Sequence, residues 1–233
     1  MMGILGIENR TENWKTARYF TPFFTTASAR GNLANKLLEP LSKSQSSNVE
    51  IELFWKGIRD HWEINQKKTK ETKKDRNVDF MKHYNRIFGD LCDSMKTSNL
   101  RSDMKENWNY SVSPRDQNAM KKPGNNLINT EIDIILKTPK HLFIGETKHL
   151  EDFSKDTDNV LVHQLIREYV TAKILLGRLD TDLKVVPFVI RDKFRAEGNR
   201  QVKFMLNQRG PDGQPWLKEE NILSWNDIEV LHP

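Results

Sequence analysis

The chain has 233 residues, of which 36% are hydrophobic and 30% charged, and its formal net charge is +5. Eleven Phe and six Trp can build a folded core, so the composition excludes general disorder. The single cysteine, Cys92, excludes an intramolecular disulfide and a cysteine-based zinc site. The N-terminus lacks the basic start and apolar stretch of a signal peptide, and no apolar run is long enough for a membrane span, so we expect a cytoplasmic protein.

Residues 1–77 are expected to form an N-terminal extension that ends in a basic linker. A short helix is predicted over residues 32–41, and the apolar spacing from Ile51 to Trp62 predicts a second helix. Aromatic residues near the N-terminus are expected to pack on the main body of the protein: Trp14, Tyr19, Phe20, Phe23 and Phe24.

The linker, residues 65–77, reads NQKKTKETKKDRN. This run suits a solvated helix end, or alternatively an arm that contacts phosphates. In the second interpretation the nucleic-acid contacts are Lys67, Lys68, Lys73 and Lys74. The next helix is predicted over residues 78–96, with Cys92 on its apolar face, where a structural thiol fits better than a nucleophile.

The remaining pattern predicts strands around 108–112, within 130–148 and at 185–190, with one long helix at 160–178. Pro187 in the last strand indicates a sheet edge or a bulge. This order predicts an α/β domain with a mixed sheet and helices on its faces. Residues 196–233 are expected to form a C-terminal extension packed on that core.

Residues 130–148, TEIDIILKTPKHLFIGETK, carry charges among β-branched residues. A turn closed symmetrically at residues 138–141 places Asp133 opposite Glu146, and Glu131 opposite Lys148. All four side chains then project from one end of one face. Parity decides this result, because a register slip of one residue would send Asp133 and Glu146 to opposite faces.

Two opposed carboxylates in a sheet repel each other and lose hydration, which costs stability unless a cation or a proton compensates. Mg²⁺ is a natural compensation, because it prefers hard oxygen ligands. Lys148 could then hold a metal-bound water or help to deprotonate it. The alternative is an exposed sheet end with a simple Glu131–Lys148 ion pair.

These residues resemble the PD-(D/E)xK nuclease superfamily, with Asp133 as the acidic residue of the second core strand and Glu146-Thr147-Lys148 as the (D/E)xK signature. The resemblance covers about residues 80–190 and implies a restriction-endonuclease-like αβββαβ core, here predicted over 78–195. It also implies that Asp133, Glu146 and the Thr147 carbonyl bind Mg²⁺ or Mn²⁺, and that Lys148 orients water or stabilises charge.

The resemblance adds further candidates around this site. Gln164 on the second core helix is one, although Tyr169 lies one residue further from it than in the Gln-x3-Tyr motif of the RecB-like branch. Many members add an acidic residue from the first core helix, for which Asp90 and Glu39 are candidates. The other candidates are Glu131 near the metal, and Arg167 and Lys173 as phosphate contacts or as solvated helix charges.

The sequence therefore predicts a metal-dependent nuclease, more suited to DNA than to RNA, that acts in defence, restriction or repair. Whether the protein forms a homodimer or binds a partner protein stays open. One alternative is a catalytically inactive subunit that keeps the nuclease fold and binds nucleic acid or assembles with other proteins. Another is an unrelated α/β interaction protein whose acidic hairpin is an ion-pair surface.

Overall fold

The structure is a computed structural model that describes residues 11–37, 48–80, 82–83, 125, 127–148, 164–192, 202, 206–207, 209, 213 and 215–232. The helices are α1 (Thr11–Thr25), α2 (Ala27–Leu37), α4 (Gly57–Thr69), α8 (Gln164–Arg178), α10 (Trp225–Glu229) and a 3₁₀ turn at Glu219–Asn221. The strands are β1 (Glu50–Trp55), β2 (Ile132–Lys137), β3 (His141–Lys148), β4 (Lys184–Arg191) and β5 (Ile222–Ser224). Residues 73–80 are also helical. No helix among the described residues is long and apolar enough to cross a membrane.

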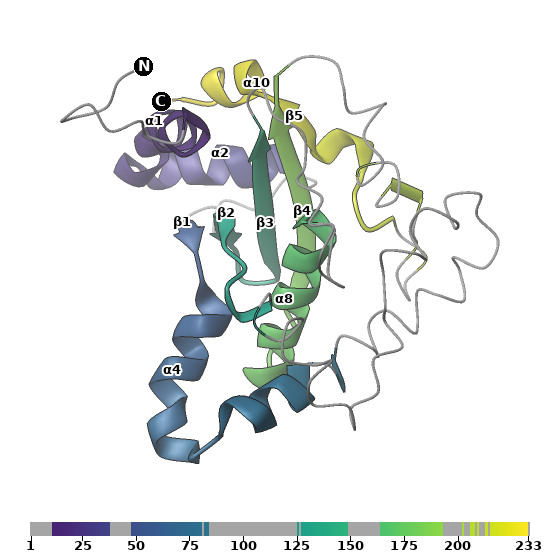
Figure 1. The fold of residues 1–233 in the computed structure, drawn as a ribbon. Coiled ribbons are helices and arrows are strands. Elements are labelled where there is room, and N and C mark those ends of the chain that lie inside the picture. Colours follow the sequence, from purple (N-terminus) through teal and green to yellow (C-terminus); the bar gives the residue numbers. More distant parts are fainter. Residues whose placement is uncertain are drawn as a thin grey trace.

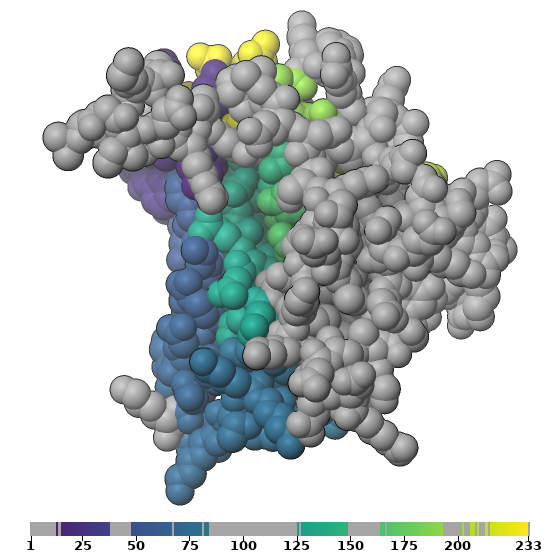
Figure 2. Space-filling view, in the orientation of Figure 1, coloured from purple at the N-terminus to yellow at the C-terminus, as the bar shows by residue number. Residues whose placement is uncertain are grey.

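The strands form one mixed sheet in the order β1-β2-β3-β4-β5. β1, β2 and β3 are antiparallel neighbours, whereas β4 is parallel to β3 and β5 is parallel to β4. α1, α2 and α10 pack on one face of the sheet, and α4 and α8 pack on the other (Figure 1). In the same orientation, the teal residues of β2 and β3 lie between purple α1–α2 and blue α4 (Figure 2). The predicted α/β architecture with a mixed, helix-flanked sheet is confirmed.

The predicted register of the β2–β3 hairpin is also confirmed. Ile135 pairs with Ile144, and Leu136 pairs with Phe143. The Thr138 N–H donates to the His141 carbonyl at 2.9 Å, and the His141 N–H donates to Thr138 Oγ1 at 3.0 Å. No described non-glycine residue of this turn has a positive φ. The turn therefore accommodates Pro139, whose ring fixes φ at a negative value.

The helix predicted from Ile51 to Trp62 is wrong in its first half. Residues 50–55 form β1, which pairs along β2, and the helix begins only at Gly57. Ile51 and Leu53 pack toward the α1–α2 side with a period of two, while Ile58 and Trp62 belong to the core under α8. The apolar residues of a strand and of the helix directly after it thus have a combined spacing that resembles that of one helix.

Of the other predictions near the N-terminus, some are confirmed and some are not. Phe20 and Phe23 are fully buried as expected, but Phe24 is 47% exposed. The Trp14 side chain, the strand predicted at 108–112, and the predicted helix beyond residue 83 lie outside the described residues. The predicted extension, residues 1–77, contains β1, and β1 belongs to the same sheet as β2 and β3.

Pro187 does not mark a sheet edge, because β4 lies between β3 and β5. The β4–β5 pairing begins only at Val189. The Pro187 carbonyl accepts a hydrogen bond from the Asn221 side-chain amide at 3.3 Å, and Asn221 directly precedes β5. The backbone edge of β4 at Pro187 therefore faces the residue before β5, not a residue of β5 itself. A missing N–H therefore interrupts no strand pairing there.

Gly145 should tolerate no side chain, because the ring of Phe188 on the adjacent strand covers it. A Cβ at Gly145 would lie 2.2 Å from Phe188 Cζ, and Phe188 is fully buried. We expect Gly145→Ala to destabilise the fold by about 1–3 kcal/mol through overpacking. Gly177→Ala on α8 is the control, since its Cβ would meet only His83 Cε1 at 3.9 Å. It should be neutral or stabilising by up to about 1 kcal/mol. Urea denaturation of both variants tests this, and equal effects would contradict it.

Candidate functional site

The β2–β3 ladder ends where the predicted acidic pair begins. Its last observed pair is Ile134 with Gly145, and Asp133 and Glu146 come next. Asp133 Oδ2 accepts the Thr147 N–H at 2.9 Å and the Thr147 hydroxyl at 2.7 Å. In a continued ladder that N–H would donate to a carbonyl of β2. The Asp133 carboxylate takes this donor, so it is fixed at the point where the strands separate.

Helix α1 supports this arrangement from the other face of the sheet. Thr16 Oγ1 lies 2.7 Å from Thr147 Oγ1, and both residues are fully buried. Because the Thr147 hydroxyl donates to Asp133, it accepts its second hydrogen bond from Thr16. Two threonines therefore connect α1 to the Asp133 carboxylate.

Glu146 is held by groups from β3 and α8. Its Oε1 accepts Lys148 Nζ at 2.6 Å and also the side-chain amide of Gln164. Glu168 lies one helical turn after Gln164, on the same side of α8, and both glutamates are fully buried. In the described part of the chain, no N–H group and no Ser, Thr or Tyr hydroxyl donates to either Glu168 oxygen or to Glu146 Oε2, and the two carboxyl groups share a hydrogen bond with each other. We call Asp133, Glu146 and Glu168 the carboxyl cluster.

Burial makes the ionised state of this cluster costly. Burial, followed by the negative charge of Glu146, raises the pKa of Asp133 to about 8, against the lowering effect of the Thr147 hydrogen bonds. Burial also raises the pKa of Glu168 to about 8. Burial and the charge of Glu168 raise the pKa of Glu146 well above its usual range, while Lys148 lowers it. The cluster therefore retains protons near neutral pH unless a cation replaces them.

The donor set fits a hard divalent cation. It offers carboxylate oxygens, among them the buried Glu146 Oε2, which accepts from no N–H group, and the backbone carbonyl of Thr147. Within the described ranges, no group of three or more His, Cys, Asp or Glu residues is arranged to hold a metal ion. Asp133 and Glu146 with one carbonyl are thus the set to consider, which suits Mg²⁺ because that ion keeps several water ligands.

The structure distributes the other predicted site residues differently. Glu131 forms an ion pair with Lys56 at 2.7 Å, and Lys148 pairs with Glu146. The Glu131–Lys148 ion pair of the alternative interpretation does not form, since each of the two residues pairs with another partner. Glu39 and Asp90 lie outside the described residues.

The predicted phosphate contacts lie on two helical regions. Arg167 is partly buried beside the cluster, where its charge lowers the pKa of Glu168, and Lys173 is exposed on the same helix. Lys68, Lys73 and Lys74 are exposed near the end of α4 and the start of the next helix, and the Lys67 side chain is outside the described set.

Sequence reasoning missed Glu168, although Gln164 and Glu168 carry the four-residue spacing that places them on one helix face. This glutamate occupies the position that holds Tyr in the Gln-x3-Tyr motif. Tyr169 itself stacks on Trp216 with ring centroids 4.4 Å apart, in the core. Thr16 had no local signal, because its partner Thr147 is 131 residues away in the sequence.

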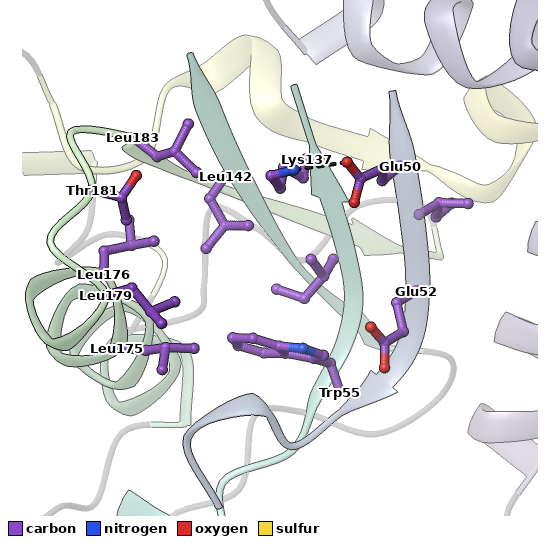
Figure 3. A pocket seen from close by; sticks show the side chains of 12 residues that line it. Glu50, Glu52, Trp55, Lys137, Leu142, Leu175, Leu176, Leu179, Thr181 and Leu183 are labelled. Carbon is purple, nitrogen blue, oxygen red and sulfur yellow. Dashed lines mark hydrogen bonds and ion pairs between the residues drawn. The ribbon is translucent and has the colours of Figure 1, made fainter. Parts of the chain in front are cut away.

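An apolar groove of about 370 Å³ lies on the same sheet face, toward the turn of the hairpin (Figure 3). Trp55, Leu142 and α8 side chains such as Leu175 and Leu179 line it, and the Glu50–Lys137 ion pair lies at its rim. No member of the carboxyl cluster lines this groove. The groove and the cluster are therefore separate features of one face.

Comparisons of the chain with protein-family models, with curated proteins and with solved structures find no match. Among the described residues, the carboxyl cluster with Lys148 and Gln164 is the arrangement whose chemistry bears most directly on function.

The carboxyl cluster should make the metal-free protein less stable as the pH rises. Between pH of about 4 and about 8 the unfolded chain loses the Asp133 proton while the folded chain retains it, so rising pH favours unfolding. Asp133→Asn cannot ionise and can still accept from Thr147. We expect it to reduce the pH dependence, to which Glu168 still contributes, and to be more stable than the wild type at pH 8 by on the order of 1–3 kcal/mol.

Urea denaturation in EDTA at pH 5 and pH 8 measures this effect. Asp227→Asn is the opposite control, because hydrogen bonds from Ser224 lower the pKa of Asp227. Its substitution should remove stability that is present above pH of about 4. A wild-type pH slope in Asp133→Asn would contradict the burial account.

Proposed function

We propose that this protein is a divalent-metal-dependent nuclease with a restriction-endonuclease-like core, acting on phosphodiester bonds in nucleic acid, DNA in preference to RNA. The observation that carries the proposal is the burial of Asp133, Glu146 and Lys148 together at the point where β2 and β3 separate. Carboxylates that retain protons, next to a paired lysine, are a site that a metal ion can organise.

The order of the elements supports the same proposal. Helix α2, the antiparallel strands β1 to β3, helix α8 and the parallel strand β4 follow the αβββαβ order that the resemblance implies. In this interpretation residues 56–131 are an insertion between the first and second core strands. Asp133 then stands in the second core strand and Glu146-Thr147-Lys148 in the third.

In this proposal some residues of the site would bind the metal ion and others would orient the metal ligands. Asp133 and Glu146 would hold the ion together with the Thr147 carbonyl. The Thr147 N–H and hydroxyl orient Asp133, while Gln164 orients Glu146. A bound Mg²⁺ or Mn²⁺ would supply Lewis acidity and a water of lowered pKa.

Lys148 has a second role in this proposal. Its ammonium group lies 2.6 Å from Glu146 Oε1 in the metal-free protein and favours the ionised form of that carboxyl group. With Glu146 engaged by a cation, Lys148 Nζ would be able to orient the attacking water or the phosphate. Because Asp133 retains its proton near neutral pH, cation binding should release protons.

The two residues of the Glu146–Lys148 pair should separate metal capture from catalysis. Lys148→Ala should bind Mg²⁺ as tightly as the wild type or slightly more tightly, because a positive charge leaves while both carboxylates stay. Its cleavage rate should fall by about 10²–10⁴-fold. Glu146→Ala should lose both metal and activity, because a ligand is removed. Lys184→Ala, an exposed lysine at the start of β4, should cleave like the wild type.

Metal titration calorimetry and nicking of supercoiled DNA, with Mg²⁺, Mn²⁺ and EDTA arms and a parallel RNA substrate, provide the measurements. Wild-type cleavage by Lys148→Ala would remove this site from the proposal. Salt-dependent binding of nucleic acid without any metal-dependent product would instead support the inactive nuclease-fold subunit.

A further inference from the structure

Arg191 ends β4 directly beside Lys148, which ends β3. The two residues are partners in the parallel β3–β4 register, two positions after the pair Glu146–Val189. Side chains of neighbouring parallel residues point to the same face, and Val189 packs in the core under α4 and α8. Arg191 therefore projects from the same face of the sheet as Glu146 and Lys148, on a strand whose backbone lies about 4.8 Å from that of β3.

Arg191 is less buried than Glu146 and Lys148. Its Nε and Nη1 atoms are buried, yet the residue keeps partial exposure, whereas Lys148 is 6% exposed and Glu146 is fully buried. A guanidinium stays protonated in proteins, so this position carries a permanent positive charge.

Helices α1 and α10 fix the ends of both strands. Lys15 of α1 pairs with Asp192, the residue after Arg191, at 2.9 Å. Lys15 Nζ also lies 4.9 Å from the ring centroid of Trp225, and Trp225 Nε1 donates to the Lys148 carbonyl at 3.3 Å. The backbones that carry Lys148 and Arg191 are therefore held in place, as precise binding requires.

We propose that Lys148 and Arg191 form a phosphate-binding pair that holds the non-bridging oxygens of the phosphodiester to be cleaved. This inference rests on the proposed nuclease function and assigns the substrate-binding charge to β4, which contributes none of the proposed metal ligands. The planar guanidinium presents paired donors that match phosphate oxygens, and Lys148 adds a point charge beside it. The carboxyl ends of neighbouring parallel strands are also where α/β sheets commonly bind ligands.

The test uses Arg191→Ala, Arg191→Lys and the control Lys184→Ala, which removes an exposed charge at the other end of the same strand. The probes are Mg²⁺ alone, measured by calorimetry, and a double-stranded oligonucleotide in Ca²⁺, measured by fluorescence anisotropy at several salt concentrations. We expect Arg191→Ala to bind Mg²⁺ within about twofold of the wild type, and to lower the slope of log affinity against log salt by about one. Its cleavage rate should fall by about 10–10³-fold.

Arg191→Lys keeps the charge, so it should retain the wild-type salt slope and cleave at an intermediate rate. This variant covers the case in which Arg191→Ala does not fold. Wild-type salt slope and wild-type cleavage in Arg191→Ala would overturn the inference while leaving the nuclease proposal intact. A wild-type protein that cleaves no nucleic acid, but whose salt slope still falls in Arg191→Ala, would refute the nuclease proposal and support the phosphate contact.

Discussion

The hydrogen bonds from the Thr147 N–H and hydroxyl to the Asp133 carboxylate are the interaction on which the rest of the site depends. They take up a ladder donor, so β2 and β3 separate at this position. The separation keeps Asp133 beside Glu146, which lies under Gln164 and Glu168 of α8. The same threonine hydroxyl contacts Thr16, so α1 on the far face is coupled to the carboxylate.

The carboxyl cluster lowers the stability of the fold locally, and apolar packing elsewhere has to compensate for that loss. The carboxyl cluster is buried, and its groups hold protons that ordinary carboxyls would release at neutral pH. Phe54, which lies between the β1–β2 pairs Leu53–Ile134 and Trp55–Ile132, has a φ of 54°, which is unfavourable for a non-glycine residue. The apolar clusters on the two faces of the sheet must offset such costs. Strained and poorly satisfied groups that a fold nevertheless retains are typical of functional sites.

The sequence predicted what local rules determine. The turn and the two-residue period set the hairpin register as far as the pair Ile134–Gly145, which Asp133 and Glu146 directly follow. β1 was not predicted, because Ile51 and Leu53 of the strand and Ile58 and Trp62 of the following helix together show a spacing that resembles one helix. Thr16 and Arg191 could not be connected to the site from sequence, because their positions depend on strand and helix packing across long sequence separations.

The central claim is that Asp133 and Glu146 share a divalent cation. The most direct measurement is a crystal structure of the protein in Mn²⁺, collected at a wavelength where manganese scatters anomalously, with an Asp133→Asn crystal under the same conditions. The account predicts an anomalous peak in contact with Asp133, Glu146 and the Thr147 carbonyl, with Lys148 Nζ displaced from Glu146, and no peak in Asp133→Asn. Ordered side chains with no peak at this position, or with the Lys148–Glu146 ion pair intact in Mn²⁺, would contradict it.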